Sequence, residues 1–597
     1  MDVEKPVIDG PVEMQWGSDY LAEVIRRLDL PFLAINPGAS LRGLHDSLVN
    51  YLGNENPQML LCLHEDHAVS IAHGYAKVTG KPMGAVVHSN VGLMHASMGI
   101  FNAWCDRAPM IVIGATGPVD AAERRPWIDW IHTSRDQGGL VRDFTKWDDQ
   151  PGSLAAAAEA MIRGSLIANT APRGPVYLCF DVSLQEARLD PSIKLPEPGR
   201  FAPPAPPYPD PASVRRLADA LAQARSPVLL AGRVSRSEES WQRRIELAER
   251  LGARVLTDLK QPAAFPTDHP LHPVAPAFFM GDEGGALLRD ADLVLSLDWL
   301  DLGGTLKVAS QAGPLEARVV HCSPDQYSHK GWSMDYQALP PLDQHLLCEP
   351  DMLVDALLAL DAKEQCFDGR ARPPAAAPER PPSPPPAGDA EITLHTLSHA
   401  LRRATEGMGV SLLRTPLGWP GNAWHFRHPL DFLGKDGGAG LGSGPGMSVG
   451  AALALRGTGR LPLAVIGDGD YMMGVSAIWT AARYRIPLLF VVANNTAYFN
   501  DELHQEKVAR TRSRPTENKA IGQHIGDPDI DIAGIARCQG AVGYGPVSTV
   551  AELAQALERG IADVRSGRVC VIDARVVPGY DSLMAKGLLR EVKEGRH

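Results

Sequence analysis

Two polar side chains that follow predicted strands carry the clearest chemistry in this sequence. Residues 463–466 form an apolar run typical of a buried parallel strand, and Asp468 follows it between two glycines. A predicted helix and a second apolar strand, residues 487–492, then lead to Asn495. Because both strands of a strand–helix–strand crossover end at the same sheet edge, we expect Asp468 and Asn495 to lie side by side. We also expect the turn at residues 467–469 to require glycine on both sides of the acid.

The oxygen atoms at this predicted edge suit a hard metal ion. A carboxylate, an amide oxygen and a main-chain carbonyl, for which Ala497 is the candidate, fit octahedral Mg²⁺ with water and phosphate oxygens as its other ligands. An acid in a glycine turn can instead simply cap a helix, as in a Rossmann-like turn. The full order of glycine–acid–glycine turn, helix and strand ending in Asn494-Asn495 favours the metal site.

The composition describes a large globular protein. Its 597 residues predict about three to four domains. The net charge of −12 argues against nucleic acid or an anionic membrane as a partner. No apolar run approaches the roughly 20 residues that span a bilayer. The first residues lack the pattern of a signal peptide, and the eight cysteines are scattered, so we expect a cytoplasmic protein with reduced thiols.

Two proline-rich stretches divide the chain. Residues 191–211 and 372–390 are typical of extended linkers. On either side of them strand-like and helix-like patterns alternate, which favours parallel α/β sheets. We therefore predict three doubly wound, mainly parallel-sheet domains over residues 12–190, 208–365 and 391–585, of which the first and third could share a fold.

A second group of reactive side chains follows predicted strands in the first segment. Glu65 opens a helix after the strand at residues 60–63; taken alone, an acid there is most often a helix cap. The strand at residues 83–87 leads to His88, and an imidazole at a strand end is suited to proton transfer near neutral pH. His95 is expected to pack on its own helix.

Together these motifs resemble the thiamine diphosphate (ThDP) enzymes of the pyruvate oxidase and decarboxylase superfamily, and among them benzoylformate decarboxylase. The resemblance rests on the GDG…NN pattern, on AVSIAHGYAKVTGKP after Glu65 and on HSNVGLMHASMGIFNAWCDRAPMIVIGATG from His88. It spans essentially the whole chain and implies a pyrimidine-binding, a central and a diphosphate-binding domain.

The resemblance also implies a role for each motif. Glu65 would share a proton with N1′ of the pyrimidine, and His88 would reach the substrate. In the glycine-rich run at residues 437–444, Leu441 would hold the coenzyme in a V conformation and the carbonyl of Ala439 would accept from its 4′-amino group. The implied sites are Glu65 and His88 for catalysis; Glu65, Ala439, Leu441, Gly467, Asp468, Gly469, Asp470, Asn495 and Ala497 for the cofactor; Asp468, Asn495 and Ala497 for the metal; and Ala39, Ser40, His88 and Ser89 for the substrate pocket.

The implied activity is ThDP- and Mg²⁺-dependent cleavage or formation of a C–C bond next to a carbonyl, through a C2 ylid and an enamine. This covers 2-keto acid decarboxylases, carboligases and 2-hydroxy ketone lyases. Two departures put simple decarboxylation in doubt. Ala39 stands where the decarboxylase has a serine, as in benzaldehyde lyase, and the stretch DWLDLGGTL from Asp298 has no counterpart of its second active-site histidine.

Two alternatives remain open. The first is an acetolactate-synthase-like enzyme with FAD in the central domain. Gly232-Arg233 follows a strand there, but no GxGxxG pattern does, so a central domain without flavin is favoured. The second is a non-catalytic ThDP-binding protein, against which the retention of Glu65, Asp468 and Asn495 counts.

The resemblance further implies a small-molecule carbonyl substrate and a coenzyme held between two chains. We therefore expect at least a homodimer, and a homotetramer as the common form. Residues 499–530 are expected to form a long lid loop, in which Arg510, Arg512 or Arg514 meets an anionic group of the substrate.

Overall fold

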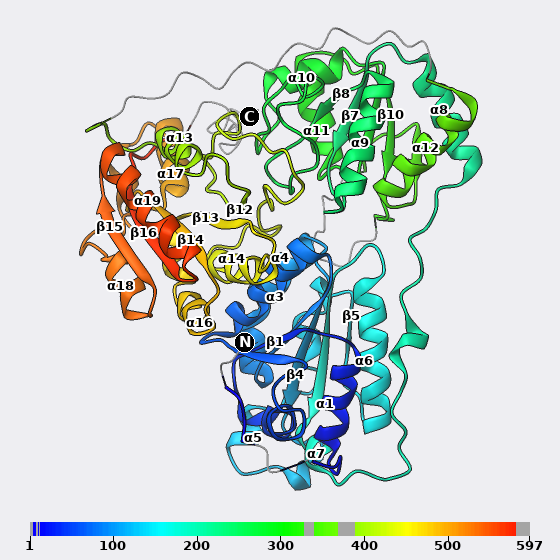
Figure 1. The fold of residues 1–597 in the computed structure, drawn as a ribbon, viewed down its shortest axis with the longest axis vertical. Helices are drawn as coiled ribbons and strands as arrows, with labels where there is room; N and C mark the ends of the chain where they lie inside the picture. The colour runs from blue at the N-terminus through cyan, green and yellow to red at the C-terminus, as the bar shows by residue number, and fades with distance from the viewer. Residues whose placement is uncertain (1–3, 8–9, 11, 328–338, 368–387, 581–597) are drawn as a thin grey trace.

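Each domain is built on one parallel sheet covered by helices (Figure 1). The computed structural model describes residues 4–7, 10, 12–327, 339–367 and 388–580. Its three sheets are parallel throughout, so the predicted fold class is confirmed. The proline-rich residues 372–387 and the predicted domain end at residues 581–585 lie outside the described residues.

The first domain has the sheet order β2-β1-β3-β4-β6-β5. All residues of β3, β4 and β6 are buried, as expected for strands covered on both faces. The main elements are α1 (Gly17–Arg27), β1 (Phe32–Ile35), α2 (Arg42–Asp46), β2 (Gln58–Leu61), α3 (Glu65–Thr79), β3 (Met83–Val86), α4 (Ser89–Cys105), β4 (Met110–Thr116), α5 (Ile128–Ile131), β5 (Trp147–Asp149), α6 (Leu154–Asn169), β6 (Pro175–Asp181) and α7 (Val182–Glu186).

The central domain has the order β11-β10-β9-β7-β8, a common doubly wound arrangement. A buried ion pair ties it to the first domain, because Nη1 of Arg107 lies 2.9 Å from Oδ2 of Asp298. Its elements are α8 (Pro211–Gln223), β7 (Pro227–Ala231), α9 (Glu238–Leu251), β8 (Arg254–Leu256), α10 (Asp282–Arg289), β9 (Leu293–Leu297), α11 (Leu302–Ala309), β10 (Arg318–Cys322), β11 (Gln344–Leu346) and α12 (Pro350–Glu364).

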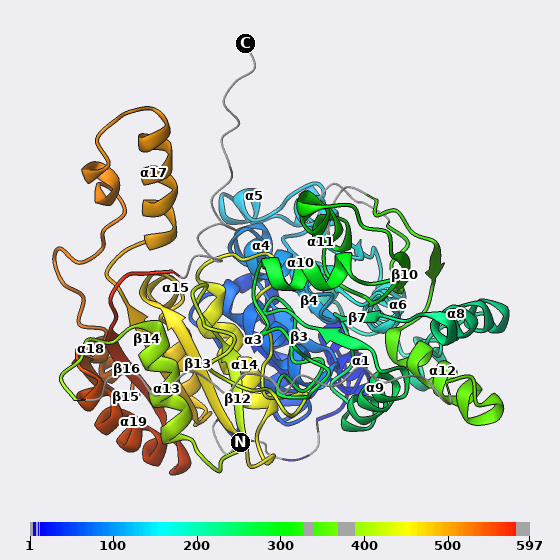
Figure 2. The same cartoon turned by 90° about the horizontal axis from the view of Figure 1, so that it is seen from above.

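The third domain has the order β12-β13-β14-β16-β15. One helix, α17, stands out from the rest of the molecule (Figure 2). The elements are α13 (Leu394–Ala404), β12 (Val410–Arg414), α14 (Ser443–Ala454), β13 (Leu461–Gly467), α15 (Asp468–Met473), α16 (Ala477–Arg483), β14 (Leu488–Asn494), α17 (Phe499–Thr511), α18 (Ile532–Cys538), β15 (Val542–Val547), α19 (Val550–Arg565) and β16 (Val569–Arg575).

The first and third domains pack together through α3 and α14, which lie side by side near the centre of the molecule (Figure 1). Small residues permit this approach. A Cβ added at Gly74 would lie 1.9 Å from the carbonyl oxygen of Met447, and one at Gly450 would lie 1.8 Å from that of Ile71. The cores of the two domains consequently merge into one buried cluster. In the part of the chain that is described, no helix is long and apolar enough to cross a membrane.

Candidate active site

The carboxyl ends of β13 and β14 bring the predicted metal ligands to one place. The strands pair with Gly467 opposite Ala493, so Asp468 and Asn495, which follow them, lie at the same edge of the sheet. Oδ1 of Asn495 accepts a hydrogen bond of 3.1 Å from the backbone N–H of Ala497. The three predicted ligands therefore share one short stretch of sheet edge.

Asp468 carries a carboxylate oxygen that no donor of the described residues satisfies. The residue is only 4% exposed. Its Oδ1 accepts from the N–H of Gly469 at 3.0 Å, whereas Oδ2 is buried and has no hydrogen-bond partner among the described residues. Burial raises the pKa of Asp468 to about 6, although nearby backbone N–H groups act to lower it. A bound cation would satisfy the free oxygen.

The structure corrects the predicted reason for the two glycines around Asp468. Gly467 has φ −70° and Gly469 lies inside α15, so neither needs the left-handed conformation. Gly469 is required by a close neighbour instead, because an added Cβ would lie 2.6 Å from Cε1 of Tyr498.

A buried ion-pair network, which the sequence did not reveal, holds this turn. Arg414 ends β12 and is 1% exposed; it donates to Oδ2 of Asp470 from Nε at 2.9 Å and from Nη2 at 2.6 Å, and it also pairs with Asp436. Oδ1 of Asp470 accepts from the N–H of Gly442 at 2.7 Å. Both Asp470 oxygens are thus engaged by the protein, and the contact with a cofactor predicted for Asp470 stays a prediction. The signal in the sequence was an arginine that closes an apolar strand.

The glycine run at residues 437–444 is shaped by α4 of the first domain. A Cβ at Gly440 would lie 2.4 Å from Cε of Met98, and one at Gly438 would lie 2.5 Å from Oδ1 of Asn102. These glycines therefore allow a helix of the first domain to approach, which the sequence pattern alone could not show.

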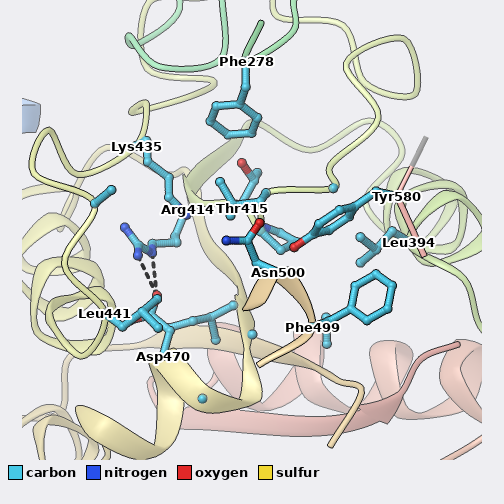
Figure 3. Close-up of a pocket in the computed structure, with 18 of the residues that line it drawn as sticks. Phe278, Leu394, Arg414, Thr415, Lys435, Leu441, Asp470, Phe499, Asn500 and Tyr580 are labelled. Atoms are coloured by element: carbon cyan, nitrogen blue, oxygen red, sulfur yellow. Dashed lines mark hydrogen bonds and ion pairs between the residues drawn. The ribbon is translucent and has the colours of Figure 1, made fainter. Parts of the chain in front are cut away.

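These parts of the third domain enclose a cavity of about 550 Å³ that is closed on one side by the central domain (Figure 3). Asp468, Asn495 and Ala497 line it together with Ala439 and Leu441, as predicted residues of one cofactor site would. Two further buried polar atoms in this cavity, Oγ1 of Thr415 and Oδ1 of Asn500, have no partner among the described residues. Other lining residues are Lys260, Phe278, Leu300, Lys435, Phe499, Asp501 and Tyr580.

Glu65 lies in the first domain and is not among the described residues that line this cavity. It begins α3, is 7% exposed, and its Oε2 lies 3.0 Å from Nδ1 of His95. The side chain of His95 is 59% exposed and its ring stacks on that of His64, with centroids 5.0 Å apart. The prediction that His95 packs on its own helix is therefore wrong.

The predicted substrate residues of the first domain form a separate group. Nδ1 of His88 lies 2.7 Å from Oγ of Ser40, which also accepts from the N–H of Ser89 at 3.3 Å. Ser40 and Ser89 are buried and Ala39 is exposed. Burial and the neighbouring His132 lower the pKa of His88, although the negative charge of Glu65 acts to raise it. His132 belongs to no motif, and no pattern in the sequence selects it.

The first part of the predicted lid loop is a helix. Residues 499–511 form α17, whose first residues line the cavity and which stands out from the rest of the molecule (Figure 2). Arg510 pairs with Glu506 on the same helix, and neither it nor Arg512 nor Arg514 belongs to the described lining of the cavity. The expectation of a long loop is therefore wrong for residues 499–511, which form a regular helix.

The fold and these two groups of side chains define a cofactor-binding α/β protein of three domains. Profiles of three domains of one family match the chain: the N-terminal TPP binding domain of thiamine pyrophosphate enzymes at residues 15–140, the central domain at 214–330 and the C-terminal TPP binding domain at 416–574. Thiamine pyrophosphate is another name for ThDP. The chain belongs to the thiamine pyrophosphate enzyme family, as the motifs predicted.

Known members of this family resemble the chain over most of its length. Benzoylformate decarboxylase of Pseudomonas aeruginosa is 26% identical over 484 residues, which cover 80% of this chain and 85% of that protein. The chloroplastic acetolactate synthase 2 of Nicotiana tabacum is 24% identical over 521 residues, or 81% and 71% of the two chains. The crystal structure of benzoylformate decarboxylase from Polynucleobacter necessarius shares the fold, with a TM-score of 0.77 at 20% identity over 94% of this chain and 99% of that one.

Proposed function

We propose that this protein uses ThDP and Mg²⁺ to cleave or form a C–C bond next to a carbonyl, as a 2-keto acid decarboxylase, a carboligase or a 2-hydroxy ketone lyase. The observation that carries the proposal is the free, buried Oδ2 of Asp468, placed beside Asn495 in a cavity of about 550 Å³. ThDP would supply a carbon nucleophile and an electron sink when bound.

The residues present fit both groups. Asp468, Asn495 and the carbonyl of Ala497 offer hard oxygen ligands to Mg²⁺, and their few oxygens suit an ion that keeps water and phosphate oxygens in its shell. Ala439 and Leu441 lie on the same cavity wall, where they would contact the coenzyme. The unpartnered Thr415 hydroxyl is a further polar group available to it.

Glu65 would exchange a proton with the pyrimidine of the coenzyme. It is a nearly buried carboxyl with its Oε2 in contact with His95, so its position is fixed while few waters compete for it. His88, held by Ser40, would carry a proton to or from the substrate. Burial keeps its imidazole neutral near pH 7, so it can accept a proton in the reaction.

Ala39 and the residues after β9 bear on whether the proposed reaction is decarboxylation or cleavage of a 2-hydroxy ketone. Asp298 follows this strand and is bound to Arg107, whereas Leu300 lines the cavity. An apolar side chain thus occupies the cavity wall near the place where the resemblance would put a second histidine. Together with Ala39, this favours carboligation or cleavage of a 2-hydroxy ketone over simple decarboxylation.

Within one chain Glu65 lies outside the Asp468 cavity, so we propose that two copies associate and that Glu65 of one copy completes the cavity of the other. A homodimer is the smallest assembly that achieves this, and a homotetramer is the expected form. We also propose a cytoplasmic location, without nucleic acid or membrane as a partner.

The experiment is to purify the protein and to follow CO₂ and aldehyde release from 2-keto acids and 2-hydroxy ketones with ThDP and Mg²⁺ added. Product that requires both additions supports the proposal; CO₂ release identifies a decarboxylase, and aldehyde release without CO₂ identifies a lyase. Flavin absorbance of the same sample would favour the acetolactate-synthase-like alternative. ThDP binding without turnover of any substrate would favour the non-catalytic alternative and contradict the proposal.

A further inference from the structure

Among the described residues, three cationic side chains line the cavity of Asp468, and one of them differs from the others. Nζ of Lys260 lies 2.9 Å from Oδ2 of Asp258 and donates to the carbonyl of Phe278 at 2.7 Å. Arg414 is paired with two carboxylates, as described above. The ammonium of Lys435 has neither an ion-pair partner nor a hydrogen-bond acceptor among the described residues.

The backbone fixes the direction of Lys435. Its N–H donates to the carbonyl of Lys260 at 3.1 Å, and its own carbonyl accepts from Nζ of Lys77 at 2.7 Å. Gly434, just before it, has φ +75° and packs against the backbone of Gln261. With both peptide groups held, the side chain reaches into the cavity between Phe278 and the Arg414–Asp470 pair (Figure 3).

An ammonium in this position is costly unless a ligand pairs with it. Burial lowers the pKa of Lys435 to about 8, and Arg414 acts in the same direction. Asp436 and Asp470 act to raise it, but both are already bound to Arg414. A lysine with a purely structural role would be expected to share one of these carboxylates.

The other charged groups of the cavity do not provide a partner. Asp468 is the proposed metal ligand, and Asp501 lies on the first turn of α17 and is not among the charges that shift the pKa of Lys435. Aromatic side chains also line the cavity, among them Phe278 (Figure 3). Lys435 is thus the cation of this cavity that no carboxylate of the described residues pairs with, and such a cation is suited to hold one anionic group of a ligand.

We propose that Lys435 is a specificity-determining residue that binds an acidic group of the substrate in addition to the reacting carbonyl centre. The preferred substrate would then be a 2-keto acid or 2-hydroxy ketone with a further carboxylate or an equivalent anion. This inference rests on the proposed function. The diphosphate of the coenzyme is the other anion that a cation in this cavity can meet, and the test separates the two.

The test compares matched substrates on wild type, Lys435→Met, Lys435→Arg and Lys260→Met, all with ThDP and Mg²⁺. The pairs are 2-oxoglutarate against 2-oxopentanoate, and 4-carboxybenzoylformate against benzoylformate. We expect Lys435→Met to lower the kcat/KM ratio of diacid to monoacid by about 10- to 100-fold in at least one pair, the range for a charged hydrogen bond. Lys435→Arg should keep most of the preference, and Lys260→Met, which removes a cation already paired, should leave the ratio unchanged.

Two binding measurements complete the test. Calorimetry with glutarate and pentanoate reports the acid preference without turnover, and quenching of tryptophan fluorescence reports the Kd of ThDP. Glutarate preference that disappears in Lys435→Met supports the inference even if no substrate is turned over, in which case only the proposed function fails. Unchanged ratios in both pairs overturn the inference while the function stands. A weaker ThDP Kd in Lys435→Met with unchanged ratios also overturns it and assigns the cation to the diphosphate.

Discussion

The sheets of the first and third domains have the same topology apart from one edge strand. When β2 is set aside, the first sheet runs β1-β3-β4-β6-β5 and the third runs β12-β13-β14-β16-β15, so each strand of one has a counterpart in the other. The sequence suggested that these domains could share a fold, and the topology bears this out. The side chains that follow β3 and its counterpart β13, however, differ.

The strand ends show how one scaffold serves two kinds of chemistry. β3 leads to His88, whereas its counterpart β13 leads to Asp468. Glu65 follows β2, the edge strand that has no counterpart in the third domain. In the proposed function the first domain thus supplies the groups that exchange protons, and the third supplies the hard oxygen ligands. The difference lies in the strand ends and the added strand, while the core of each sheet is retained.

Among the changes that test this comparison, replacement of Glu65 by glutamine should cause the largest loss of activity. Turnover should fall roughly 100- to 10,000-fold, the range for a general acid–base group, because the proton that Glu65 exchanges is lost. Glu552→Gln is the matched control, since Glu552 also lies in the first turn of a helix but belongs to a capping box of α19. Comparable activity of the two variants would mean that Glu65 is only a helix cap.

Replacement of Asp468 by asparagine tests the metal chemistry of the third domain. Loss of the charged ligand should weaken Mg²⁺-dependent ThDP binding by about 100-fold or more. Titration of fluorescence quenching with ThDP at several Mg²⁺ concentrations measures this. Asp501→Asn, which alters another carboxylate of the same cavity, should bind nearly as wild type. Equal losses in both variants would remove Asp468 from its proposed role.

An arginine that pairs with two aspartates occurs in both domains, exposed in the first and buried in the third. Arg414 binds two aspartates at 1% side-chain exposure, and Arg142 binds Asp136 and Asp148 at 48% exposure. Arg414→Met should cost about 3–5 kcal/mol because it leaves buried carboxylates unpaired, and Arg142→Met about 1 kcal/mol or less. The midpoints of thermal unfolding of the two variants measure this difference. Similar shifts in both variants would contradict the larger contribution of the buried network.

The smallest expected effect is the pH dependence of Asp66 at the interface of α3 and α14. Burial raises the pKa of Asp66 to about 6, although hydroxyls of Ser70 and Ser443 act to lower it. A raised pKa means that the folded state is favoured below the ordinary pKa near 3.8 and loses this contribution as pH rises to about 6. Asp66→Asn should therefore gain about 1–3 kcal/mol relative to wild type between pH 4 and pH 6, and keep this gain above pH 6. If the unfolding midpoints of wild type and Asp66→Asn changed in parallel with pH across this range, the raised pKa of Asp66 would be contradicted.

The elements and part of the site followed from local sequence. Apolar runs identified β3, β13 and β14 within about two residues of their observed bounds, and crossover topology placed Asp468 beside Asn495. The Arg414 network, the contact of Gly440 with α4, and the pairings of Glu65 with His95 and of His88 with His132 all depend on tertiary neighbours. No spacing in the sequence reports such neighbours, and α17 was missed because its polar residues were interpreted as a loop.

The most direct test asks whether the two domains complete one site across two chains. Glu65→Gln and Asp468→Asn chains are expressed together with different affinity tags, and oligomers that carry both tags are purified and assayed. In a two-fold dimer with one chain of each kind and the site between chains, one of the two sites regains both native residues. A mixed dimer should therefore show about half of wild-type activity, and tetramers that carry both tags should be more active than either variant alone. Activity no higher than that of either variant alone, in oligomers shown to contain both chains, would contradict the account.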